Sequence, residues 1–237
     1  MIPFSPPRID QKVIDEVVDT LKSGWITTGP KTKEFERRLT AYCGNKATLA
    51  VNSNTVGLEV VLRWFGVQEG DEVIVPVYTY CATANVIVHC GAKPVMVDVN
   101  ADDFDVCLEK VRRAITNKTK VIMPVDLGGM PCAYDELFEL VETEEVKTLF
   151  QAKTEEQRKL GRILILSDSA HSIGAEYKGR KAGSLADVSV FSFHAVKNLT
   201  TAEGGAIMLN LPEPFDNEEV YRYLWPRRKR GHGVMTC

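Results

Sequence analysis

An aspartate and a lysine stand at the carboxyl ends of two apolar segments of this chain. Asp168 follows the run 163–166, and Lys197 comes shortly after the run 188–191. Because ligands gather at the carboxyl ends of parallel strands, the two side chains should meet there. An amine can form a Schiff base with the aldehyde of pyridoxal phosphate (PLP), and a carboxylate can pair with the ring nitrogen of that cofactor. The pair therefore predicts a PLP site.

Both residues also have ordinary interpretations. An aspartate in a loop between a strand and a helix usually caps the helix, and a lysine is usually exposed on the surface. The apolar residues around Lys197, which include Phe191, Phe193 and Val196, favour a partly desolvated amine instead. Desolvation lowers the pKa of a lysine and makes it a usable nucleophile and base.

The segment 168–171, followed by 192–205, closely resembles the DegT/DnrJ/EryC1/StrS family of PLP-dependent nucleotide-sugar aminotransferases. The segments 24–30, 53–57 and 75–98 look like further family segments in the family order. The resemblance therefore covers nearly the whole chain. It implies PLP fold type I, a three-layer α/β/α arrangement around a mostly parallel, seven-stranded sheet.

The resemblance also implies roles for four residues near the two strand ends. Lys197 would hold PLP and shuttle a proton, and Asp168 would pair with the ring nitrogen. Ser192 would contact the phosphate, and His171 would lie near the ring hydroxyl. Without the family, Ser192 would be interpreted as a capping serine and His171 as a hydrogen-bonded core histidine.

The segment Ser53-Asn54-Thr55 lies where the first predicted strand gives way to a helix. Such side chains often cap a helix, but the free N–H groups of a helix start also bind phosphate. The family binds the PLP phosphate here, so Asn54 and Thr55 are predicted phosphate contacts, with Asn54 in place of the usual glycine.

Two further segments are assigned to ligands by the resemblance. The tyrosines after the strand at 71–75 could be packing residues, but an aromatic face also suits a flat heterocycle. The family position of the stacking aromatic matches Tyr80 rather than Tyr78. Trp25, Thr28 and Gly29 match the amino-terminal substrate loop of the family, although an unrelated Gly-Pro turn would look similar.

The pattern of apolar runs predicts alternating strands and helices around one sheet covered on both faces. The expected strands are 47–51, 71–75, 94–97, 120–125, 162–166, 188–193 and 206–209. The expected helices are 9–21, 31–42, 56–65, 82–90, 108–116 and 134–141, and the charged stretch 142–160 is expected to be a solvated helix or insertion. Residues 1–237 would form a PLP-binding large domain with an amino-terminal helical segment over about 1–45, without the small carboxyl-terminal domain of the family.

Composition limits the classes of function. The chain has 237 residues, 44% of them hydrophobic, and a net charge of −3, which argues against nucleic-acid binding. The amino terminus lacks the features of a leader, and no apolar run is long enough to span a bilayer, so a cytoplasmic protein with no membrane contact is expected. The six cysteines are scattered without metal-ligand spacing, so no metal site is expected.

The implied reaction transfers an amino group, by family analogy from glutamate, to a nucleotide-linked keto sugar, for amino-sugar or cell-surface polysaccharide biosynthesis. The family sites lie at a homodimer interface. Lys197 argues against the dehydratases of the family, which carry histidine there, and Asp126 stands where the family often has a histidine. The alternative is a catalytically inactive, PLP-binding or dimerising fragment. A Rossmann oxidoreductase is disfavoured because no GxGxxG follows the first strand.

Overall fold

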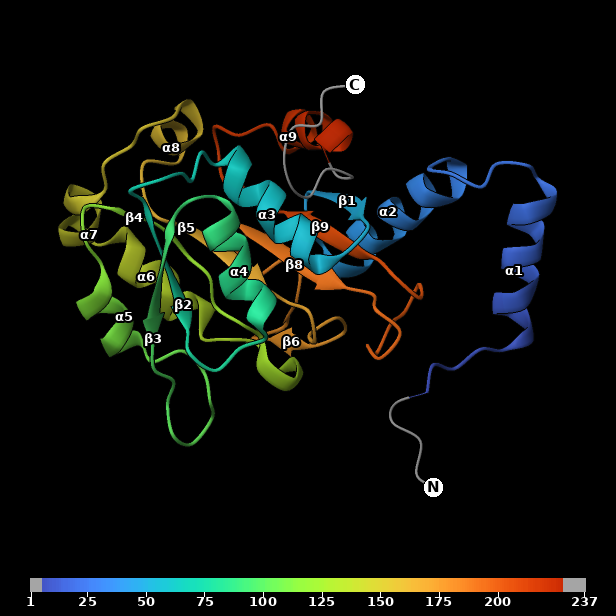
Figure 1. The fold of residues 1–237 in the computed structure, drawn as a ribbon, viewed down its shortest axis with the longest axis horizontal. Helices are drawn as coiled ribbons and strands as arrows, with labels where there is room; N and C mark the ends of the chain where they lie inside the picture. The colour runs from blue at the N-terminus through green and yellow to red at the C-terminus, as the bar shows by residue number, and fades with distance from the viewer. Residues whose placement is uncertain (1–5, 228–237) are drawn as a thin grey trace.

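A seven-stranded sheet organises the chain in the order β1-β9-β8-β5-β4-β2-β3 (Figure 1). The computed structural model describes residues 6–227. The strands are β1 (Ala47–Val51), β2 (Glu72–Pro76), β3 (Lys93–Val97), β4 (Thr119–Ile122), β5 (Leu164–Asp168), β8 (Val188–Ser192) and β9 (Gly205–Leu209). Neighbouring strands are parallel except that β9 runs antiparallel to both β1 and β8. All seven predicted strands are present, and the predicted fold class is confirmed.

Helices cover both faces of this sheet. One buried cluster joins the sheet to α3 (Asn54–Trp64), α4 (Cys81–His89) and α9 (Asn217–Leu224). The cluster on the opposite face contains residues of α2 (Pro30–Cys43), α5 (Leu108–Ala114), α6 (Tyr134–Glu142) and α7 (Glu144–Leu149). Figure 1 shows α3 and α4 in front of the sheet. The observed arrangement is therefore the predicted three-layer α/β/α sandwich.

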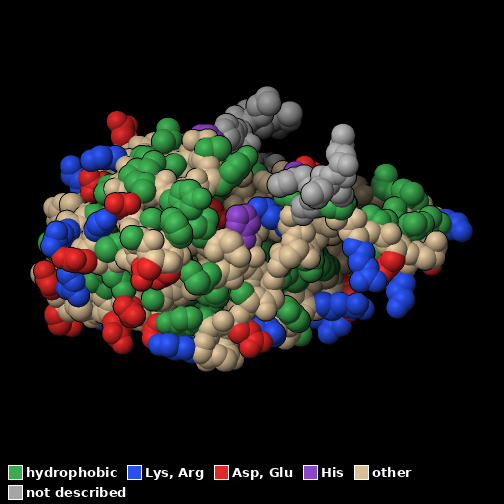
Figure 2. All heavy atoms as spheres, turned by 90° about the horizontal axis from the view of Figure 1, so that it is seen from below, with side chains coloured by type: hydrophobic (Ala, Val, Ile, Leu, Met, Phe, Trp, Pro, Cys, Tyr) green, Lys and Arg blue, Asp and Glu red, His purple; other side chains and the backbone are tan. Residues whose placement is uncertain are grey.

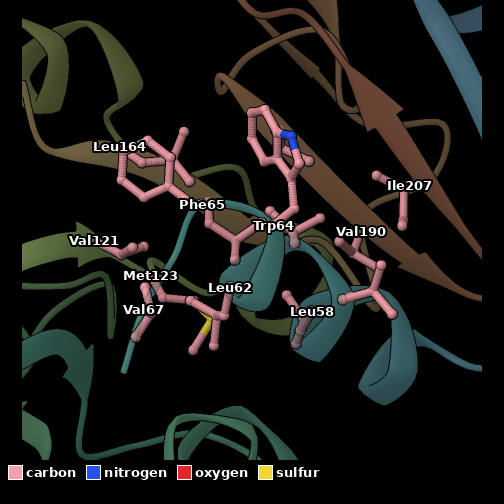
Figure 3. Close-up of a cluster of buried hydrophobic side chains, with 14 of the residues drawn as sticks. Leu58, Leu62, Trp64, Phe65, Val67, Val121, Met123, Leu164, Val190 and Ile207 are labelled. Atoms are coloured by element: carbon pink, nitrogen blue, oxygen red, sulfur yellow. The ribbon is translucent and has the colours of Figure 1, made fainter. Parts of the chain in front are cut away.

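Burial on both faces explains why the central strands are continuously apolar. Along β5, Leu164 and Leu166 point into the cluster beneath α3, while Ile165 points into the cluster on the other face. Figure 3 shows Leu164 with Phe65 of the α3 end in the first of these clusters. Each face of the strand needs an apolar side chain, so the alternation typical of a half-exposed strand is lost.

The charged stretch 142–160 was predicted to be a solvated helix or insertion, and its structure differs in detail from one solvated helix. It forms two short helices, α7 and α8 (Glu155–Leu160), each capped by a threonine hydroxyl. The side chain of Gln157 in α8 is fully buried and donates a 2.8 Å hydrogen bond to the carbonyl oxygen of Phe65. The sequence did not predict the two-residue strands β6 (Glu176–Tyr177) and β7 (Arg180–Lys181), or α9. The two strands are too short to show a periodic pattern, whereas α9 is amphipathic and its pattern was overlooked.

The amino-terminal helix α1 (Gln11–Lys22) lies apart from the sheet (Figure 1). It has no buried residue, although its sequence is strongly amphipathic. Its exposed apolar side chains include Val13, Val17 and Leu21, and Figure 2 shows apolar side chains gathered at this end of the molecule. No helix within residues 6–227 is both long enough and apolar enough to cross a membrane.

Candidate cofactor site

A cavity of about 390 Å³ opens at the carboxyl ends of the parallel strands. Loops that follow β1, β2, β4, β5 and β8 all contribute to its wall. The cavity brings together seven of the residues predicted from the sequence, namely Asn54, Thr55, Tyr80, Asp168, His171, Ser192 and Lys197. The cavity therefore lies at the edge of the sheet where the sequence predicted the PLP site.

Asp168 is the last residue of β5, and its carboxylate is held by neutral donors. Its side chain accepts hydrogen bonds from the amide of Asn54 at 3.0 Å, the hydroxyl of Thr83 at 2.7 Å and the backbone N–H of Ala170 at 3.3 Å. Burial raises the pKa of this carboxyl, and the hydrogen bonds from Thr83 and Asn54 act against that rise. The carboxylate is thus fixed in orientation at the cavity wall.

Lys197 lies on the loop that follows β8 and is half-buried. Burial lowers the pKa of its amine, and the negative charge of Asp168 partly opposes that effect. The neighbouring Asn198 donates a 2.7 Å hydrogen bond to the carbonyl oxygen of Ile173, on the segment after β5. The two segments that carry the predicted amine and acid are therefore joined directly.

The side chain of Asn54 points to the acid as well as to the cavity. Its amide nitrogen donates to Asp168 Oδ1 and, at 2.7 Å, to the carbonyl oxygen of Val190. The backbone N–H groups of Asn54 and Thr55 belong to the first turn of α3, at the positive end of that helix. Ser53 caps the helix by accepting from the N–H of Val56 at 3.2 Å. Phosphate binding by Asn54, which stays a prediction, would use its backbone.

The remaining cavity residues differ in exposure. Tyr80 is 76% exposed just before α4, so its ring is accessible to a ligand. Ser192 is buried at the end of β8, and its hydroxyl accepts a 3.4 Å hydrogen bond from the N–H of His194. His171 is exposed as a whole, but partial desolvation at the cavity together with the charge of Lys197 lowers the pKa of its imidazole. An imidazole with a lowered pKa is neutral over more of the physiological pH range.

The structure does not bring the predicted substrate loop to this cavity. Trp25, Thr28 and Gly29 are not among the residues that line it. They form a local turn in which the indole N–H of Trp25 donates to the carbonyl oxygen of Thr28 at 3.1 Å and the ring packs against Gly29. Their substrate role remains a prediction.

Asp126 is directed into the protein although it borders the cavity. Its carboxylate accepts from the hydroxyls of Tyr134 and Ser172, each at 2.6 Å, from Ser169 at 3.0 Å and from the N–H of Cys132 at 3.2 Å. Burial raises the pKa of this carboxyl, and these donors act against the rise. Asp126 therefore anchors the segment that follows Asp168.

Thr83 is a site residue that sequence reasoning missed. It lies in α4, is fully buried and contacts the predicted ring-nitrogen partner directly. Its hydroxyl also lies 2.7 Å from that of Thr79, which precedes α4, but this local contact gives no sign of Asp168. Within residues 6–227, no group of three or more histidines, cysteines or acids is arranged to hold a metal ion; Cys237 lies outside the described residues.

The family model of the DegT/DnrJ/EryC1/StrS aminotransferases matches residues 7–231 of the chain. The uncharacterized protein MJ1066 of Methanocaldococcus jannaschii is 41% identical over 233 residues, which are 98% of this chain and 54% of that protein.

Solved structures agree with the family match. Spr1654 from Streptococcus pneumoniae, assigned as a sugar aminotransferase, is 54% identical in its PMP form, with a TM-score of 0.91 over 94% of this chain and 55% of that chain. Its PLP form has a TM-score of 0.90 over 93% and 56% of the two chains. DesI, solved with its TDP-sugar product, is 32% identical, with a TM-score of 0.74 over 89% and 49%. The chain spans about half the length of these proteins. The family match and the PMP and PLP forms of Spr1654 confirm the predicted PLP cofactor.

Proposed function

The chain belongs to the DegT/DnrJ/EryC1/StrS aminotransferase family, and from this premise we propose that it is the cofactor-binding part of an enzyme that aminates a nucleotide-linked keto sugar. Residues 1–237 would then constitute the PLP-binding large domain. The single observation that carries the proposal is the meeting of Asp168 and Lys197 in one cavity at the carboxyl ends of β5 and β8.

The two residues have complementary tasks. Bound PLP supplies an electron sink for negative charge that develops at the substrate carbon. The Asp168 carboxylate, held by neutral donors, can keep a proton on the ring nitrogen by charge complementarity. The lowered pKa of Lys197 increases the fraction of neutral amine, which can bind the cofactor aldehyde and later carry a proton to and from the substrate.

The phosphate end of the cofactor fits the first turn of α3. The positive end of the helix dipole and its leading N–H groups favour an anion there. Gly205 brings the start of β9 against this turn, since a Cβ atom at that position would lie 2.8 Å from the backbone nitrogen of Asn54. The hydroxyl of Ser192 borders the same cavity. This arrangement supports phosphate contacts by Asn54, Thr55 and Ser192.

The remaining features of the reaction follow the relatives and the family resemblance. DesI was solved with a TDP-sugar product, which supports a nucleotide-linked sugar as the acceptor. Glutamate is the proposed amino donor, and the product would enter amino-sugar or cell-surface polysaccharide biosynthesis in the cytoplasm. The active enzyme is proposed to be a homodimer, with the exposed Tyr80 stacking on the cofactor and Trp25, Thr28 and Gly29 on the substrate side.

A PLP titration tests the cofactor part of this proposal. The purified chain should develop an absorbance band with PLP, and borohydride reduction followed by peptide mapping should label Lys197. Lys197→Ala should remove both signals, whereas Lys110→Ala, which changes an exposed lysine paired with Asp98, should remove neither. A label on another lysine, or none in a folded sample, would contradict the assignment.

The catalytic part needs a separate assay. A version of the enzyme that spans the full length of its relatives should transfer the amino group of glutamate to a TDP-linked keto sugar. Binding of PLP with no transfer to any nucleotide-linked keto sugar would favour the alternative of an inactive, PLP-binding family member.

A further inference from the structure

Both oxygens of the Asp168 carboxylate are held by side chains, those of Asn54 and Thr83. The proposed reaction gives a task to the backbone of Asn54 but none to either side chain. The amide of Asn54 donates to Oδ1, and the hydroxyl of Thr83 donates to Oδ2. We infer that Asn54 and Thr83 are positioning residues that fix the orientation and the negative charge of Asp168 for a cationic ring nitrogen. This inference rests on the proposed function of the cavity.

Asn54 joins three elements through one buried amide. Its nitrogen donates to Asp168 at the end of β5 and to the carbonyl oxygen of Val190 in β8, the residue paired with Asp168 across the two parallel strands. Both amide hydrogens are used, so the side chain cannot flip without losing both hydrogen bonds. Since Asn54 also begins α3, the helix end proposed for phosphate is held at a set position relative to the acid.

Thr83, in α4, fixes the second carboxylate oxygen. Its side chain is fully buried, and its hydroxyl lies 2.7 Å from Asp168 Oδ2 and 2.7 Å from the hydroxyl of Thr79. A threonine hydroxyl has one hydrogen to donate. If Thr83 donates it to the carboxylate, Thr79 must donate to Thr83, which makes a directed chain of hydroxyls from the cavity wall to the acid.

These donors act on charge as well as on geometry. Hydrogen bonds to a carboxylate favour its ionised form, and here they oppose the effect of burial. The charge of His171 acts on Asp168, and the charge of Asp168 acts on Lys197. The other titratable groups that line the cavity are Tyr80, Asp126, His194 and Glu203. Loss of the Thr83 hydroxyl should therefore weaken the pairing of Asp168 with a protonated ring nitrogen while leaving Lys197 in place.

The test compares two variants of similar shape. Thr83→Val removes the hydroxyl and keeps the branched side chain, and Thr83→Ser keeps the hydroxyl. We expect Thr83→Val to raise the dissociation constant for PLP about tenfold or more, the effect of losing one hydrogen bond to a charged group. It should also shift the pH midpoint of the absorbance band of bound PLP. Thr83→Ser should stay within about threefold of the wild type.

Two further variants separate this role from a structural one. Asn54→Ala should also raise the PLP dissociation constant, and it serves if Thr83→Val does not fold. Ser189→Ala alters a buried hydroxyl in β8 that has no hydrogen-bond partner, so binding and pH midpoint should match the wild type. Wild-type dissociation constants and pH midpoints in both Thr83→Val and Asn54→Ala would overturn this inference alone. A wild-type chain that binds no PLP would overturn the proposed function and, with it, the inference.

Discussion

Each end of the β5–β8 strand pair holds a buried aspartate, but the hydrogen-bond donors differ in charge. At the amino end, Asp187 precedes β8 and forms two hydrogen bonds with the guanidinium of Arg162, at 2.7 and 2.8 Å. It also accepts from the N–H of Ile165 at 2.9 Å. At the carboxyl end, Asp168 is equally inaccessible to solvent but is held by neutral donors.

The difference separates a structural acid from a functional one. Arg162 already supplies the positive charge that Asp187 needs, and although burial acts to lower the pKa of the guanidinium, its hydrogen bonds to Asp187 raise that pKa overall. The pKa of Asp168 is raised by burial because no such compensation is built in. A ligand with a protonated ring nitrogen can supply the missing charge. A buried acid that faces a cavity without a bound cation is therefore a better guide to function than a buried ion pair.

Removing the cation at the amino end should have the largest effect on stability. Arg162→Met leaves Asp187 buried without its partner, and such losses cost about 3–5 kcal/mol of unfolding free energy. Urea unfolding of the chain would measure it. The double variant Arg162→Met with Asp187→Leu should recover part of the loss because no unpaired charge remains. A single-variant cost below about 1 kcal/mol would show that the ion pair is not structural.

A change in backbone packing at the cavity end should have an intermediate effect. In Gly205→Ala the new Cβ atom would lie 2.6 to 2.8 Å from the backbone of Phe191, Ser53 and Asn54, none of which can rotate away. We expect a cost of about 1–3 kcal/mol, typical of overpacking, and weaker PLP binding because the start of α3 is displaced. Unfolding and PLP titration on the same sample would measure both. A variant that loses stability but keeps wild-type PLP affinity would separate this contact from the cofactor site.

Neutralising the acid at the cavity end should cost little stability. In Asp168→Asn the amide oxygen can still accept from Asn54, and the Thr83 hydroxyl can rotate to accept from the new NH₂ group. Since the folded-state pKa of Asp168 lies above its ordinary value of 3.8, the ionised carboxylate destabilises the folded chain. The variant should therefore be up to about 1 kcal/mol more stable than the wild type at neutral pH.

The difference in unfolding free energy between Asp168→Asn and the wild type should depend on pH. Below the unfolded pKa the carboxyl is protonated in both states, so the advantage of Asp168→Asn should vanish near pH 4 or below. It should grow as the pH rises through the folded pKa of Asp168. Urea unfolding of both proteins from about pH 4 to about pH 7 would measure the difference. A variant that loses stability as the pH rises, relative to the wild type, would mean that the carboxylate is stabilised as Asp187 is.

The smallest effect is expected at a hydroxyl between the two ends. Ser189 lies in β8, and its buried Oγ has no hydrogen-bond partner. Ser189→Ala removes this group without creating a large cavity, so we expect the chain to gain about 0.5–1 kcal/mol of stability. Thermal and urea unfolding would detect it, with PLP binding unchanged. A loss of stability would indicate that the hydroxyl is hydrogen-bonded in solution.

The family, the fold and the core of the site were predictable because local patterns encode them. Continuous apolar runs located the strands, and the polar residues at their ends located Asp168 and Lys197 at one edge. The task of Thr83 was not predictable, since a threonine within a helix gives no local sign of the acid that lies 85 residues away. The side-chain direction of Asn54 depends on contacts 114 and 136 residues distant. The division of the stretch 144–160 into two short helices was not predicted, because its many charged residues gave no sign that Gln157 is buried.

The antiparallel course of β9 has a consequence for how the site assembles during folding. The chain leaves β8, passes Lys197 in the loop 193–204 and re-enters the sheet as the neighbouring strand β9. Within this loop, the N–H of Phe193 donates to the carbonyl oxygen of Gly204, and the carbonyl oxygen of Phe193 accepts from the N–H of Thr201. The connection spans residues 193–204, far fewer than separate Asp168 from Asn54 or Thr83, so this hairpin can form early. The hydrogen bonds from Asn54 and Thr83 to Asp168 join distant parts of the chain and must form later. We expect hydrogen exchange during refolding to protect the hairpin around Lys197 before the start of α3, so that the nucleophile is in place before the Asn54 side chain that holds Asp168.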